Sequence, residues 1–236
     1  MSDERLREAE RRWKESGSVE DEARYLLERV RVGELSRELL RLAGHSGHDA
    51  SRLAMELGGA PPADMGLREF RDWCLALRGC GKLACVLVAA VMAEKSSTAL
   101  ANTRLGNADF FPDAMMIIRN WLACPCAEHS LHAHDAWRHL PDWHAVRSHF
   151  EIGPSEHVML WHALSIYYSV KATGTAPHAR TPSGRAEDYL ATKASRLAAE
   201  ASCYTVRALG TPILTPALKE VAHWALLPVS RPTKLG

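Results

Sequence analysis

The sequence shows no excess of charge of one sign. Its 236 residues include 29 lysines and arginines and 28 aspartates and glutamates, which gives a formal net charge of +1 at pH 7. Proteins that bind nucleic acid through its phosphates usually carry a basic excess or a clustered basic face. The balanced charge therefore argues against nucleic acid as a partner of this chain.

Long apolar runs are absent as well. The longest uncharged apolar run extends from Leu83 to Ala93, about half of the roughly 20 residues that a membrane-spanning helix needs. The first residues, Met-Ser-Asp-Glu-Arg, are charged and show no apolar core of a signal peptide. Cys80 and Cys85 lie in or beside apolar sequence, as reduced thiols often do. These features predict a cytoplasmic protein without a membrane span.

The motifs of the common enzyme classes are missing too. The sequence contains no glycine-rich phosphate loop, no G-x-S-x-G nucleophile elbow, no HExxH zinc motif and no paired-carboxylate signature. An enzymatic activity stays open, but the absence of a catalytic set favours a protein that binds a partner without converting it.

Helical periodicity runs through most of the chain, whereas the alternating pattern of strands is nearly absent. Leu6 and Trp13 recur at helical spacing and predict a first helix over 4–16. Ser18, with Asp21 three residues later, is typical of the start of a second helix. Later apolar stripes predict helices near 82–94, 112–123, 155–167, 186–209 and 216–227. The predicted fold class is all-α, either a multi-helix bundle or a short solenoid-like array of helical hairpins.

Two turn-rich stretches divide the chain. Gly58-Gly59-Ala60-Pro61-Pro62 predicts a charged N-terminal helical-hairpin module over 1–60, followed by a main helical bundle over 63–236, or else one continuous domain. A second stretch, Thr173 to Arg185, predicts an exposed loop that a protease could cut.

One short segment resembles part of an ankyrin repeat. Leu40 to His48, with Gly59-Ala60 further on, is similar to the L-x-L-A-x-x-x-G-H and terminal G-A of that repeat. The pattern departs from the repeat over 50–52, and no second copy occurs one period away. Because a single repeat cannot bury its own face, we interpret the segment as a helix-turn-helix.

Two further segments are similar to parts of uncharacterised multi-helical bacterial proteins with a C-P-C-x-x-H element. They read VEDEARYLLERVRVGELSRELLRLAGHSGH and WLACPCAEH. The resemblance implies a helical fold and carries no activity.

The most unusual stretch is rich in cysteine and histidine. Cys126, His129 and His132 follow one another at intervals of three residues, so they could share one face of a helix. Thiolate and imidazole are preferred ligands of zinc, and four of them close a tetrahedral site. Cys124, Cys126, His129 and His132 are therefore candidate ligands of a structural zinc ion. Two alternatives to a zinc site stay open. Cys126 could simply pack inward while the histidines are exposed, or a cysteine could be a nucleophile with His129 as its base.

The charged N-terminal helices supply the candidate partner-binding residues. Trp13 lies on a highly charged helix, and tryptophan is enriched at binding hot spots. With Arg12, Tyr25 and Arg29 it forms the surface that we expect to contact another protein. The sequence thus favours a non-enzymatic helical scaffold or adaptor. The alternatives are a zinc-binding helical protein and a regulatory partner or inhibitor of a cytosolic bacterial enzyme, controlled through the Thr173–Arg185 loop.

Overall fold

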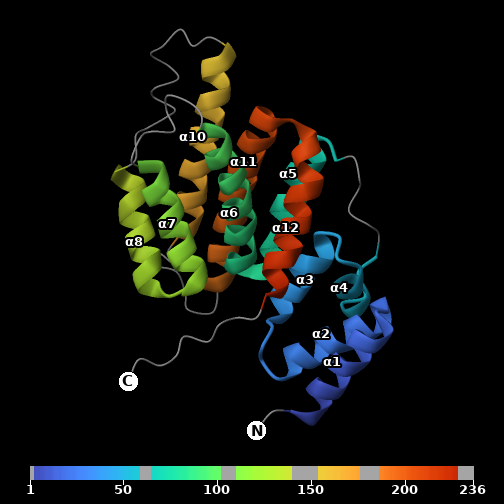
Figure 1. The fold of residues 1–236 in the computed structure, drawn as a ribbon. Coiled ribbons are helices and arrows are strands. Elements are labelled where there is room, and N and C mark those ends of the chain that lie inside the picture. Colours follow the sequence, from blue (N-terminus) through green and yellow to red (C-terminus); the bar gives the residue numbers. More distant parts are fainter. Residues whose placement is uncertain (1–2, 59–64, 102–109, 140–153, 176–185, 228–236) are drawn as a thin grey trace. The chain divides into compact units, whose positions relative to one another are not determined.

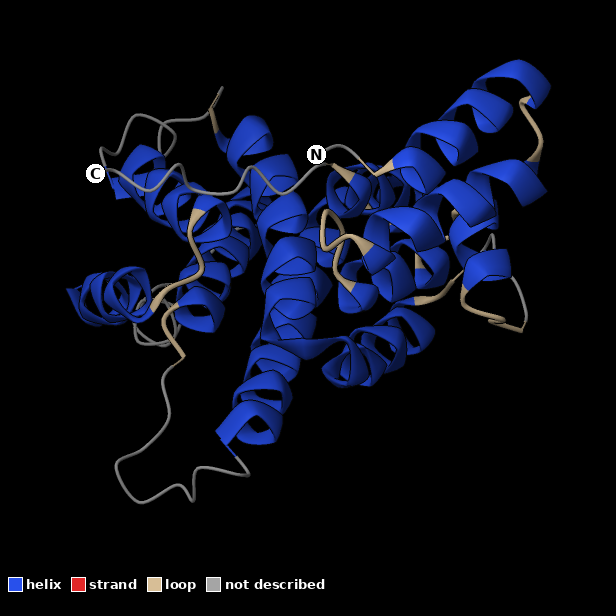
Figure 2. Cartoon of the chain, turned by 90° about the horizontal axis from the view of Figure 1, so that it is seen from below, coloured by secondary structure: helices blue, strands red, loops and turns tan. Residues whose placement is uncertain are grey.

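The computed structural model describes residues 3–58, 65–101, 110–139, 154–175 and 186–227. Every regular element in these ranges is a helix, and the ranges contain no strand (Figure 2). The prediction of an all-α, multi-helix fold is therefore confirmed. Most of the predicted Thr173–Arg185 loop lies outside the described residues.

The chain forms two compact units. The first combines residues 1–63 with 215–236, and the second spans 64–214. The sequence predicts a break near 60–63 and assigns everything after it to the main bundle. The last helix differs from that expectation, because it belongs to the first unit. An apolar stripe shows that a helix is packed, but not which neighbour it packs against.

The first unit is built from short, well-capped helices. They are α1 (Glu4–Ser16), α2 (Val19–Arg31), α3 (Arg37–His45), α4 (Asp49–Ala54) and nearly all of α12 (Leu214–Leu226). Gly17 adopts the left-handed conformation (φ 62°) that ends α1. The Ser18 hydroxyl then caps α2 by accepting a hydrogen bond from the backbone N–H of Asp21 (3.1 Å). This tight turn lets α1 pack along α2 as a helical hairpin.

The second unit is a bundle around three mutually packed helices. It contains α5 (Leu67–Ala76), α6 (Gly81–Leu100), α7 (Phe110–Ala123), α8 (Ala127–His139), α10 (Pro154–Thr173) and α11 (Ala186–Leu209), with single-turn helices at Leu77–Cys80 and Thr211–Ile213. Helices α6, α10 and α11 pack on one another, as Figure 1 shows. Helix α5 packs on α11, while α7 and α8 pack on α10. The α7–α8 pair carries the cysteine- and histidine-rich stretch.

A buried hydroxyl cluster joins the three central helices. The Thr205 Oγ1 lies 3.0 Å from Ser96 Oγ and 2.7 Å from Ser165 Oγ, and all three side chains are buried. Small hydroxyl and alanine side chains allow the helix backbones to approach closely. Because each hydroxyl finds a partner, its burial costs little.

The segment with the most apolar sequence is a core helix. The stretch Leu67–Leu100 is long and apolar enough, by length and composition, to cross a membrane. In the protein, 61% of its most apolar window is buried inside the second unit. Helix α6 buries side chains on all of its faces, as expected for the central helix of a bundle. This agrees with the expectation that the Leu83–Ala93 run is a buried helix.

Candidate functional site

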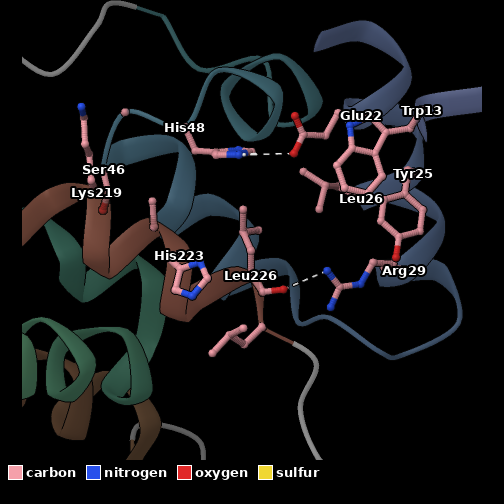
Figure 3. Close-up of a pocket in the computed structure, with 13 residues that line it drawn as sticks. Trp13, Glu22, Tyr25, Leu26, Arg29, Ser46, His48, Lys219, His223 and Leu226 are labelled. Atoms are coloured by element: carbon pink, nitrogen blue, oxygen red, sulfur yellow. Dashed lines mark hydrogen bonds and ion pairs between the residues drawn. The ribbon is translucent and has the colours of Figure 1, made fainter. Parts of the chain in front are cut away.

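A pocket of about 400 Å³ opens within the first unit. Its lining residues come from α1, α2, the turn between α3 and α4, and α12 (Figure 3). Three segments from the first 50 residues and the distant helix α12 thus contribute to one concave surface. Its volume falls within the range of small-ligand and side-chain pockets, roughly 300–1,000 Å³.

Two stacked aromatic rings form one wall of the pocket. The ring centroids of Trp13 and Tyr25 lie 5.1 Å apart, with 13° between the ring planes. The α1–α2 hairpin sets this contact, because it places the end of α1 beside the middle of α2. Both side chains are only half-buried, so the stack presents apolar surface to the pocket. Leu26, from the next position of α2, adds a buried aliphatic group.

Arg29 extends into the same region and is almost fully buried, with 6% of its surface exposed. Its Nη1 donates a hydrogen bond to the carbonyl of Leu226 (2.8 Å) at the end of α12 (Figure 3). The last carbonyls of a helix have no partner within the helix, and Arg29 supplies one here. Its Nε lies 4.0 Å from a carboxylate oxygen of the half-exposed Glu34. Its Nη2 has no hydrogen-bond partner among the described residues. The guanidinium therefore keeps unused donor capacity in a buried position.

The charged side chains of the lining are Arg29, Lys219 and Glu22. The carboxylate of Glu22 faces the ring of His48, whose Nε2 lies 3.4 Å away. The exposed Lys219 contributes a second cationic side chain from α12. Ser46 is buried, and its hydroxyl lacks a partner within the part of the chain that the structure describes. The carboxylate in the lining thus has a polar neighbour, whereas a buried hydroxyl and part of a guanidinium do not.

The structure brings three of the four predicted partner-binding residues together. Trp13, Tyr25 and Arg29 all line the pocket, and Arg12 does not. The Arg12 side chain is 62% exposed, and its Nε donates to Glu8 (2.9 Å), one turn earlier on α1. The contribution of α12 was not foreseen, since nothing in its sequence points to the N-terminal helices.

The cysteine- and histidine-rich stretch forms a separate cluster in the second unit. A tight turn at Pro125 connects α7 to α8, and the backbone N–H of Cys126 donates to the carbonyl of Cys124 (2.8 Å). The ligand atoms of Cys124, Cys126 and His129 all lie within 4.8 Å of one another. The Cys126 sulfur is 3.2 Å from Nδ1 of His129. His132, the fourth predicted ligand, is exposed and does not belong to this group.

The two thiols of the cluster differ in acidity. Cys126 immediately precedes α8, and its sulfur accepts a hydrogen bond from the backbone N–H of His129, which lowers the pKa of Cys126. The hydrogen bond with Cys126 raises the pKa of the Cys124 thiol. Cys126 is therefore the first of the pair to become a thiolate.

A polar network holds the first turn of α8 in place. The Ser130 hydroxyl donates to the carbonyl of Cys126 (3.0 Å) and accepts from Nε1 of Trp121 (2.8 Å). The Lys82 ammonium donates to Ser130 (3.3 Å) and to the carbonyl of Thr175 (2.8 Å). It also lies 4.6 Å from the Trp121 ring. Burial lowers the pKa of Lys82 to about 8. Nothing in the sequence points to this lysine, because its partners come from distant segments of the chain.

The pocket and the Cys/His cluster share no residue and lie in different units. Each must therefore be interpreted from its own chemistry. The chain matches no protein-family model, no curated protein and no solved structure.

Proposed function

We propose that this protein is a helical adaptor whose first unit binds a short acidic segment of a partner protein in the pocket. The observation that carries the proposal is the nearly buried Arg29, which keeps an unpartnered Nη2 beside the stacked rings of Trp13 and Tyr25. Tryptophan, tyrosine and arginine are the residues most enriched at binding hot spots. An aromatic wall next to a guanidinium suits an apolar side chain followed by a carboxylate.

The charges of the pocket favour an acidic ligand over a basic one. Arg29 and Lys219 carry positive charge, and the carboxylate of Glu22 already faces His48. The Arg29 Nη2 is buried, so the guanidinium must turn toward the pocket to donate to a carboxylate of the partner. The resulting charge-assisted hydrogen bond is about twice as strong as a neutral one. A lysine or arginine in the same place would meet like charge in a partly desolvated setting.

The size of the pocket favours a short segment over a large surface. A volume of about 400 Å³ accommodates a few side chains, and the rigid aromatic rings lose little conformational freedom when a ligand binds. The partner is therefore proposed to contribute an extended or loop segment that inserts its side chains. We propose a cytoplasmic location for the protein, which the six free thiols support.

A peptide selection tests the proposed function. Random peptides displayed on phage are selected on the wild-type protein, and the affinities of the enriched sequences are measured. We expect them to share an aspartate or glutamate next to an apolar residue. Exchange of Trp13 for alanine removes half of the aromatic wall and is expected to weaken their binding at least about tenfold, since such anchors contribute more than about 1.4 kcal/mol.

The matched control is Arg12→Ala, which removes an exposed side chain from the neighbouring position of α1. It should leave the affinity unchanged. Selection of basic or purely apolar peptides would contradict the proposal. The same is true of acidic peptides that bind the Trp13 and Arg12 variants equally well.

A further inference from the structure

We propose that Cys124, Cys126 and His129 bind a zinc ion and leave one coordination position open to an external donor. This inference rests on the second unit alone, so it does not depend on the proposed role of the pocket. Two thiolates and one imidazole form a donor set that zinc prefers.

The spacing of the three ligand atoms fits one ion. Zinc binds sulfur at about 2.3 Å and nitrogen at about 2.0–2.1 Å, so the edges of its tetrahedron measure roughly 3.6–3.8 Å. The Cys126 sulfur and the His129 Nδ1 are already 3.2 Å apart. No pair of ligand atoms in the group is separated by more than 4.8 Å. The His129 Nδ1 also lies 3.0 Å from the carbonyl oxygen of Cys124, and it gives up this hydrogen bond and its proton when it binds the ion. Side-chain shifts of about 1 Å then bring the three ligand atoms to the tetrahedral spacing.

The local backbone supports this geometry before any ion binds. The turn at Pro125 holds the two cysteines close together, through the hydrogen bond from the Cys126 N–H to the Cys124 carbonyl. Ser130 fixes the carbonyl of Cys126 and is itself tied to Trp121 and Lys82. Groups that do not touch a metal commonly orient its ligands through hydrogen bonds of this kind. The three ligands are also half-exposed, so an ion can reach them from solvent.

The fourth position separates this site from the structural zinc site that the sequence suggests. His132 is exposed and does not join the three converging ligands. Sites with three protein ligands hold a water molecule or an exogenous group in the remaining position, whereas structural sites close all four positions. Among the described residues, no other histidine, cysteine, aspartate or glutamate joins the group. The cluster is therefore inferred to be a three-ligand site that an external nitrogen, oxygen or sulfur donor can complete.

Zinc and cobalt titrations of the full-length chain test this inference. The reduced protein is loaded with Zn²⁺, passed through a desalting column and analysed for metal content. We expect one zinc ion per chain, and its loss in both Cys126→Ser and His129→Ala. With Co²⁺ in place of zinc, we expect tetrahedral visible bands, a sulfur-to-metal charge-transfer band, and a shift of the visible bands on addition of imidazole.

His132→Ala is the matched control and should retain the metal and the cobalt spectrum. Circular dichroism verifies that each variant is folded. If a cysteine variant does not fold, the cobalt spectrum of the wild-type protein still tests whether sulfur binds the metal. Absence of bound zinc, retention of zinc by Cys126→Ser, or loss of zinc from His132→Ala would each overturn the three-ligand assignment. Visible bands that imidazole leaves unchanged would overturn the open position.

Discussion

Exchange of Arg29 for methionine is expected to weaken the binding of an acidic peptide by about 10- to 100-fold. Methionine keeps the unbranched aliphatic stem but removes the guanidinium that would donate to the ligand. A hydrogen bond to a charged group contributes roughly 1.5–3 kcal/mol, which corresponds to this range of affinity. Isothermal titration calorimetry with a peptide from the selection measures the effect directly.

The same substitution also removes the hydrogen bond from Arg29 to the Leu226 carbonyl. A lower melting temperature is therefore expected, and the affinity must be measured well below it. Arg12→Met controls for the loss of one positive charge from the N-terminal helices, because Arg12 is exposed and lies outside the pocket. An Arg29→Met protein that is folded and binds the acidic peptide with wild-type affinity would show that this guanidinium does not contact the ligand.

Exchange of Gly174 for alanine is expected to destabilise the second unit by about 1–3 kcal/mol. Gly174 follows α10 and packs directly against the backbone of α8. A Cβ atom at this position would lie 2.6 Å from the backbone nitrogen of His134 and 2.8 Å from the carbonyl carbon of Ala133. Backbone atoms cannot rotate away as a side chain can, so α8 must shift. Thermal unfolding followed by circular dichroism should show a lower melting temperature.

Gly79→Ala provides the matched control for this prediction. It lies in the short helix Leu77–Cys80, and a Cβ there meets no heavy atom within 4 Å. The change should be neutral or slightly stabilising, since alanine restricts the unfolded chain. Equal melting temperatures for the Gly174 and Gly79 variants would mean that the second unit accommodates the clash at α8 without cost.

The local signals of the sequence predict the helices well. The helix predicted over 4–16, which carries Trp13, coincides with α1. Asp3 caps the start of this helix and Gly17 ends it. The hydroxyl of Ser18 caps the next helix as its spacing to Asp21 predicts. These features act within a few residues of the chain, so a single sequence contains them in full.

The pocket is less accessible to sequence reasoning because it combines distant segments. Tyr25 and Arg29 are four residues apart on α2 and therefore lie on the same face. Arg12 is adjacent to Trp13 but points about 100° away from it around α1, and its exposed side chain pairs with Glu8 instead of lining the pocket. The place of α12 in the first unit depends on tertiary packing, which includes the contact between Leu226 and Arg29.

The Cys/His cluster shows how far a spacing argument extends. Cys126 and His129 are three residues apart and do meet in the structure. A further step of three residues to His132 rotates the side chain by about 60° more and brings the total rise along α8 to roughly 9 Å. Regular spacing therefore predicts a pair of neighbours correctly but overestimates how many of these residues can converge on one point.

A double-mutant cycle between Arg29 and the carboxylate of the bound peptide tests the central claim most directly. Calorimetry gives four affinities, for the wild-type and Arg29→Met proteins with the acidic peptide and with its amide analogue, in which glutamate is replaced by glutamine or aspartate by asparagine. If the carboxylate binds Arg29, the two changes are not additive, and the coupling energy should be about 0.5–3 kcal/mol. Additive effects would contradict the account, because they would place the acidic group of the partner away from Arg29.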